Sequence, residues 1–94
     1  MKVRESLENF VVLPLPDHEA RRRYENAVMT WERYSGDPDT VEINAEILAS
    51  YTRACQAANL MNSASTGNWR YIRMILQAAV RNGVDVPYLR ESGD

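Results

Sequence analysis

The sequence predicts an all-α protein: a small helical bundle of three main helices, with a short N-terminal helix or arm and a short C-terminal turn. Three observations support this fold class. Apolar residues make up 45% and charged residues 26% of the 94 residues, which is typical of a globular chain. Apolar side chains recur every three or four residues in three segments. Short breaks rich in Gly, Pro or Ser separate these segments, so we expect one domain over residues 1–94.

The N-terminal segment has two interpretations. Leu7, Phe10 and Val11 have the spacing of a short helix, whereas residues 10–13 would also suit a short strand. A lone strand would leave its backbone groups unpaired. We therefore expect a helix or an extended arm that packs on the bundle.

The second segment predicts a helix from His18 to Tyr34. Asp17 is a suitable N-cap because its carboxylate can accept from the free N–H groups of the first turn. Gly36 is a natural stop for the helix. One apolar stripe runs along this segment, formed by Ala20, Tyr24, Ala27, Val28, Trp31 and Tyr34.

The third helix is predicted from Pro38 to Met61, with Asp37 as its cap and Pro38 in the first helical position. Because apolar residues fall on two of its faces, we expect this helix to be central. One stripe comprises Val41, Ala45, Leu48, Tyr51, Cys55 and Ala58, and the other comprises Ile43, Ile47, Ala54, Ala57 and Met61.

The fourth helix is predicted from Asn68 to Arg81, after a break at residues 63–67. Thr66 or Asn68 would cap it, and Gly83 would end it. Asp85 would then cap a single turn that begins near Pro87. The buried face of the fourth helix is expected to contain Trp69, Ile72, Ile75, Leu76, Ala79 and Val80.

The chain has one cysteine, Cys55, so it cannot form an internal disulfide, and a reducing compartment is expected. No apolar run approaches the ~20 residues that a membrane span needs. The first residues do not resemble a secretory signal. We therefore expect a cytoplasmic protein that does not bind membranes.

The sequence predicts no catalytic site, no metal site and no cofactor. His18 is the single histidine, and a solvated residue at a helix start is favoured over a general base. One His and one Cys cannot build a zinc site. Cys55 lies on an apolar stripe, which favours a buried small side chain over a nucleophile. The chain is accordingly expected not to be an enzyme.

Acidic residues gather at the start of the predicted third helix. Paired carboxylates such as Glu42 and Glu46 can bind metal or share a proton, although a solvated helix face is the commoner arrangement. The same cluster could instead contact a basic partner. It comprises Asp37, Asp39, Glu42 and Glu46.

Basic residues are distributed unevenly. Between residues 49 and 84 there are four arginines and no acid, although the whole chain has a formal charge of −2. Arg70, Arg73 and Arg81, with Gln77, recur along the polar face of the fourth helix. Arginine forms bidentate contacts with phosphate or carboxylate, and Tyr71 beside this face could stack on a base. A second basic cluster comprises Arg21, Arg22 and Arg23.

This basic face also has two interpretations. It is either solvated surface or a weak, salt-dependent binding site for nucleic acid or an acidic protein. A strong duplex binder usually has a basic total charge, which this chain lacks.

The segment from Asn68 to Leu76, NWRYIRMIL, followed by NGV at 82–84, resembles the DnaD-like replication initiation domain. That family has a Y-x-x-x-I-x-x-x-W pattern on a late helix; Tyr71 and Ile75 match the first two anchors, and Ala79 stands at the third. Upstream, WERYSGDP at 31–38 resembles the family's segment before an Ala-rich helix. The resemblance covers about residues 20–84. It implies an all-helical domain that helps to load a replicative helicase, binds DNA weakly and self-associates.

Two hypotheses of function follow. The first is a binding module in DNA replication or phage DNA metabolism that docks phosphate or an acidic protein on the fourth helix. The second is a small phage or mobile-element accessory protein that acts only by protein contact: an inhibitor of a host defence complex, an assembly chaperone or a structural subunit. A protein partner is expected in both, and a homodimer would add buried area to so short a chain.

Overall fold

Helices account for all the regular secondary structure of the described residues, in agreement with the predicted all-α bundle. A computed structural model describes the backbone of residues 1–11, 18–58 and 62–91, and side chains within these ranges except at 62–68, 90 and 91. No strand occurs in these ranges, and none of their helices is long and apolar enough to cross a bilayer. The elements are α1 (Val3–Phe10), α2 (His18–Ser35), a 3₁₀ turn η1 (Thr40–Glu42), α3 (Ala45–Ala57), α4 (Asn62–Arg81) and α5 (Pro87–Glu91).

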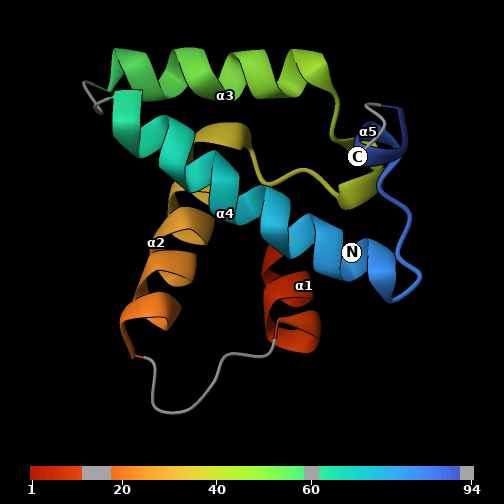
Figure 1. Ribbon diagram of the computed structural model, residues 1–94. Coiled ribbons are helices and arrows are strands. Elements are labelled where there is room, and N and C mark those ends of the chain that lie inside the picture. Colours follow the sequence, from red (N-terminus) through yellow and green to blue (C-terminus); the bar gives the residue numbers. More distant parts are fainter. Residues whose placement is uncertain (12–17, 59–61, 92–94) are drawn as a thin grey trace.

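α4 is the central element. Figure 1 shows it crossing the molecule, with α1 and α2 on one side and α3 on the other. Its most extensive packing is against α2, and the next most extensive is against α1. The predicted inner face is largely confirmed, because Ile72, Ile75, Leu76 and Ala79 are fully buried. Val80 is an exception to the prediction, since 43% of it is exposed.

α2 begins at the predicted residue and ends within one residue of its predicted end. Tyr24, Ala27, Val28 and Trp31 are buried on its inner face, as the 3.6-residue period requires. Gly36 follows the helix with φ +80°, a left-handed conformation that favours glycine, so its predicted role as the stop is confirmed. The predicted cap, Asp17, lies outside the described residues.

The N-terminal segment is a helix over residues 3–10, so the strand alternative is wrong at Phe10, and residues 12 and 13 of that alternative lie outside the described residues. Glu5 accepts a hydrogen bond from the backbone N–H of Lys2 at 3.1 Å and thereby caps the first turn. Val3 and Leu7 lie one turn apart and are buried in the core, against which Val11 also packs. α1 is therefore part of the bundle.

The predicted third helix begins seven residues too early. η1 and a short loop occupy the positions after Pro38, and α3 begins only at Ala45. Asn44 is the cap in place of Asp37, because its side chain accepts from the backbone N–H of Ile47 at 2.8 Å. Asp37 has φ +53° and cannot begin a helix in that conformation.

The expectation that the third helix is central is also wrong. Within α3 only Tyr51 and Cys55 are buried, whereas Ala57 and Ala58, one from each predicted apolar stripe, are exposed. Ile43 is buried, but from the loop that precedes the helix. Apolar content on two faces did not indicate burial here, because much of it is alanine, which releases little apolar area when buried. The predicted C-terminal residue, Met61, lies outside the described residues.

α4 begins at Asn62, six residues before its predicted start. Residues 63–67 were expected to form a break, yet their backbone is helical, so neither Thr66 nor Asn68 is the cap. Ser, Thr and Gly lower helix propensity by only ~0.5–1 kcal/mol each, which packing elsewhere along a long helix can offset. At the other end Gly83 has φ +92°, and α5 begins at the predicted Pro87.

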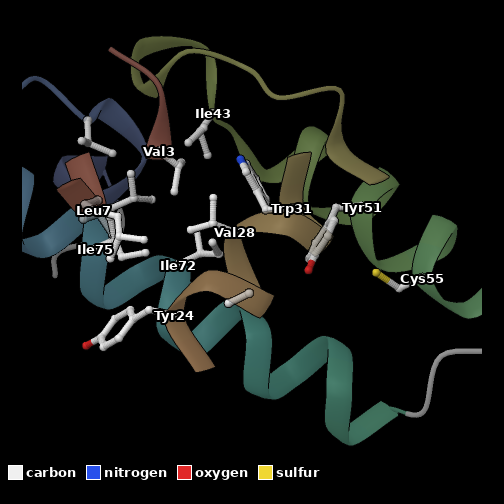
Figure 2. Close-up of a cluster of buried hydrophobic side chains, with 14 residues drawn as sticks. Val3, Leu7, Tyr24, Val28, Trp31, Ile43, Tyr51, Cys55, Ile72 and Ile75 are labelled. Atoms are coloured by element: carbon white, nitrogen blue, oxygen red, sulfur yellow. The ribbon is translucent and has the colours of Figure 1, made fainter. Parts of the chain in front are cut away.

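A line of aromatic rings connects four helices. The ring of Trp31 in α2 meets that of Tyr51 in α3 at 5.0 Å between centroids, and that of Trp69 in α4 at 6.0 Å. Trp69 in turn meets Tyr88 of α5 at 6.1 Å. Figure 2 shows Trp31 among Val28, Ile43 and Tyr51 in the core. The Trp31 side chain is therefore the common contact of α2, α3 and α4.

Arg4 attaches α1 to α2 through its whole guanidinium group. Its Nε and Nη2 donate to the two carboxylate oxygens of Glu32 at 2.9 and 2.8 Å, and Nη1 donates to Glu25 at 3.0 Å. The bond from Arg4 holds the pKa of the Glu32 carboxyl below its usual range. Glu32 and, to a smaller extent, Glu25 raise the pKa of Arg4. This geometry is bidentate, which is the strongest form of such a pair.

Trp31→Ala should destabilise the protein by about 3–5 kcal/mol, because it removes a fully buried side chain that contacts two other helices. Urea unfolding followed by circular dichroism measures the loss. Met29→Ala in the same helix is the matched control: Met29 is 58% exposed, and the change should stay within about 0.5 kcal/mol. Equal effects of the two substitutions would contradict this description of the core.

Arg4→Ala should lower the free energy of unfolding by about 1 kcal/mol at neutral pH, since half-exposed ion pairs contribute modestly. Because the folded-state pKa of Glu32 is depressed, this contribution is complete above the unfolded value of about 4.3 and disappears as pH falls through the lower folded value. Urea titrations of both proteins at neutral and acid pH measure the difference. Arg81→Ala, which removes an exposed arginine, should show neither effect.

Candidate functional site

The basic face predicted for the fourth helix lies on the outer side of α4. Arg70 and Arg81 are exposed, and Arg73 and Gln77 are half-buried. Eleven residues separate the two exposed arginines, which corresponds to about 16 Å along the axis at 1.5 Å per residue. Met74 and Val80, 42% and 43% exposed, lie at the two edges of the same side. We refer to these residues together as the α4 outer face: Arg70, Arg73, Met74, Gln77, Val80 and Arg81.

The arginines differ in whether an acid of the same molecule neutralises them. Arg4 and Arg23 form ion pairs with glutamates of the same molecule. Arg70 and Arg81 have no hydrogen bond or ion pair with any residue that the structure describes, and α4 itself contains no acid. Arg73 differs from them, because it interacts within the molecule. Two guanidinium groups on the α4 outer face therefore keep their donors available to a ligand.

Tyr71 is less accessible than a base-stacking residue needs to be. It is half-buried, and its ring packs edge-to-face against Tyr24 of α2, with 5.0 Å between centroids. The nearby Tyr71 hydroxyl, together with Glu19, raises the pKa of the Arg23 guanidinium. The structure thus assigns Tyr71 a contact between α2 and α4.

The second basic cluster lies near the start of α2. Arg21, Arg22 and Arg23 are all exposed, and Arg23 also donates to Glu19 at 2.6 Å. Cations near a helix N-terminus oppose the helix dipole, so the dipole gives no reason for three arginines there. Through the contact between Arg23 and Tyr71 this cluster reaches α4, a link that sequence spacing alone could not have shown.

The four acidic residues of the predicted partner face do not act alike. Asp39 accepts from the N-terminal ammonium group at 2.7 Å, which holds the pKa of its carboxyl down, and also from the backbone of Val41 at 3.3 Å. Lys2 donates to the backbone oxygen of Asp37 at 2.6 Å. Glu42 lies in η1 and Glu46 in the first turn of α3, so they do not share one helix. Both of these glutamates are exposed, without an ion pair to a described residue.

The groups most suited to covalent chemistry are not assembled into a site. Cys55 is fully buried, and burial raises the pKa of its thiol. Figure 2 shows its sulfur on the side that faces Tyr51. His18 is exposed at the start of α2. Over the described ranges, no three His, Cys, Asp or Glu side chains gather as metal ligands would.

Comparison of the chain with known protein families, with functionally characterised proteins and with solved structures finds no match. The DnaD-like resemblance therefore depends on the sequence pattern alone. Of the residues that match that pattern, Ile75 is fully buried and Tyr71 is covered by Tyr24, so both have a packing role in this fold.

The Cys55 thiol should react with a disulfide reagent at least about tenfold more slowly in the folded protein than in urea, because the reactive thiolate is both inaccessible and disfavoured. Absorbance of the released thiolate of the reagent measures the rate. Rapid, complete reaction under native conditions would contradict the burial of this side chain and would restore Cys55 as a candidate nucleophile.

Proposed function

We propose that this protein is a non-catalytic binding module that docks an anionic macromolecule on the α4 outer face, with DNA as the leading ligand. The observation that supports the proposal is the state of Arg70 and Arg81. Both are exposed on a rigid helix, and neither is neutralised by an acid within the described part of the chain. Such arginines can place planar donors against phosphate oxygens at little conformational cost.

The expected affinity follows from the number of cations. If two to four arginines each neutralise one phosphate, the logarithm of the binding constant should fall against log salt with a slope of about −2 to −4. The chain has a net charge of −2, so long-range attraction does not add to these contacts. Binding should therefore be weak and sequence-independent, which suits an accessory role in which other proteins supply specificity.

The DnaD-like resemblance supports DNA replication as the setting, with the helicase-loading machinery as the wider assembly. Under this proposal Arg70 and Arg81 bind phosphates of the DNA backbone, while the exposed Arg21 and Arg22 of α2 extend the contact with DNA. Tyr71 acts indirectly, because its ring packs on Tyr24 and joins α4 to α2, the helix that carries Arg21 and Arg22. No catalytic group, metal or cofactor takes part.

A second candidate function is supported by Met74 and Val80. Phosphate contacts do not need exposed apolar side chains, whereas Arg and Met are both enriched in the cores of protein interfaces. An accessory protein that acts only by protein contact, in a phage or mobile element for example, would use the same face with an acidic partner surface. Binding to DNA distinguishes the two candidates.

Arg70→Ala combined with Arg81→Ala should lower DNA affinity at least about tenfold and reduce the salt slope by about 2, because two phosphate contacts are removed. Fluorescence anisotropy with labelled single-stranded and duplex DNA over a salt series measures both quantities. The matched control is Arg33→Ala with Arg53→Ala, which removes two exposed arginines from α2 and α3 and leaves the α4 outer face intact.

The Arg33→Ala, Arg53→Ala control should keep most of the DNA affinity and the full salt dependence of binding. Absence of binding at low salt, or equal losses in the two double variants, would exclude DNA docking on α4. A protein that binds no DNA but co-purifies with a stoichiometric protein through Arg70 and Arg81 would support the second candidate.

A further inference from the structure

A second exposed surface combines apolar and charged side chains, and its charge is opposite to that of the α4 outer face. Val41 in η1 is 54% exposed, and the exposed carboxylates Glu42 and Glu46 follow it along the chain. We call these three residues the 41–46 patch. Four residue steps separate the glutamates, so their Cα atoms are at most about 14 Å apart.

The two surfaces reflect a separation of charge along the whole chain. Residues 1–48 contain ten acids and six bases, a net charge of −4. Residues 49–84 contain four bases and no acid, a net charge of +4. Several acids of the first part are already engaged inside the molecule: Glu25 and Glu32 with Arg4, Glu19 with Arg23, and Asp39 with the N-terminus.

We propose that a second copy of this chain is a ligand of the α4 outer face, and that its 41–46 patch is the surface that docks there. The pairing places Glu42 and Glu46 of one copy opposite Arg70 and Arg81 of the other. The arginines lie about 16 Å apart along the axis of α4 and the glutamates at most about 14 Å apart, so the pairing depends on opposite charge and not on equal spacing. Val41 would meet Met74 or Val80, so each surface offers the other both opposite charge and an apolar contact.

This inference rests on the proposed docking role of α4 and adds a regulatory consequence. DNA and a second copy would use the same two guanidinium groups, so an α4 outer face that holds a second copy cannot bind DNA at the same time. The free basic face would be most available when the protein is dilute, and a long anionic ligand would dissociate the assembly.

Sedimentation equilibrium of the purified chain without DNA tests the association. Self-association is expected at about 0.1 M salt and should be lost at about 1 M, where the Debye length falls from roughly 10 Å to 3 Å. Arg70→Glu with Arg81→Glu, and separately Glu42→Arg with Glu46→Arg, should each weaken the association at least about tenfold through like-charge contacts. Mixing the two variants should restore a complex through two contacts: the unchanged patch of the first variant meets the unchanged α4 outer face of the second, and the two reversed surfaces match each other as well.

A control mixture tests whether this rescue depends on the α4 outer face or only on total charge. Arg33→Glu with Arg53→Glu has the same total charge as the α4 variant but leaves the α4 outer face unchanged, and it should not rescue the Glu42→Arg, Glu46→Arg variant more than the wild-type chain does. A wild-type chain that stays monomeric at low salt, or equal rescue by the control, would overturn the inference. Circular dichroism confirms that each variant is folded.

The failure of this inference can be told from the failure of the proposed function. The Glu42→Arg, Glu46→Arg variant keeps the α4 outer face and should still bind DNA, at least as tightly as the wild type does. DNA binding without self-association would leave the function standing and overturn the second copy as a ligand. Self-association with charge-swap rescue but no DNA binding would support the inference and exclude DNA.

Discussion

The packing of α2 against α4 around Trp31 is the interaction on which the other contacts depend. A chain of 94 residues buries only roughly 60–65% of the surface that its unfolded form exposes, so a few large side chains must provide most of the core. Trp31 contacts both Tyr51 and Trp69, and Trp69 extends the line to Tyr88. One row of rings thereby holds α3 and α5 to the central pair of helices. α1 is attached differently, through Val3, Leu7 and the Arg4 ion pairs.

The core also determines which part of α4 faces a ligand. Once Ile72, Ile75 and Ala79 are buried, the helical period leaves Arg70 and Arg81 on the opposite side, without any freedom to turn inward. The proposed binding surface is therefore held by the buried side chains of the same helix. A rigid helix that presents arginines loses little entropy on docking, which matters for a surface with so few contacts.

Local sequence rules were sufficient for α2 and for the ends of helices at glycine. The apolar spacing of α2, together with Gly36 beyond its end, predicted the bounds of this helix within one residue. The local rules were insufficient at the start of α3. Pro38 suited a first helical turn, but the backbone oxygen of Asp37 accepts a hydrogen bond from the side chain of Lys2, 35 residues away. A contact of that separation leaves no local signal. The start of α4 was missed for another reason: residues 63–67 have weak helix propensity, yet the helix extends through them.

The candidate site shows the same division between local and distant information. Periodicity was enough to place Arg70, Arg73 and Arg81 on the polar side of one helix, and the structure places Arg70 and Arg81 outside. The sequence could not show that Tyr24 covers Tyr71, because the two residues meet only through the packing of α2 on α4. It also could not separate Asp37 and Asp39, which contact the N-terminal residues, from Glu42 and Glu46, which remain exposed.

The balance of charges limits how any partner can recognise this protein. At physiological salt the field of a surface charge decays over about 8 Å, and beyond that distance a ligand experiences a molecule with a net charge of −2. Distant steering towards α4 is therefore weak, and selectivity must arise at contact. There, Arg70 and Arg81 supply directional donors, while Met74 and Val80 supply apolar area that a phosphate backbone does not use. Because arginine donors and exposed apolar side chains occur together on one helix face, a protein surface, including that of a second copy, is a candidate ligand as well as DNA.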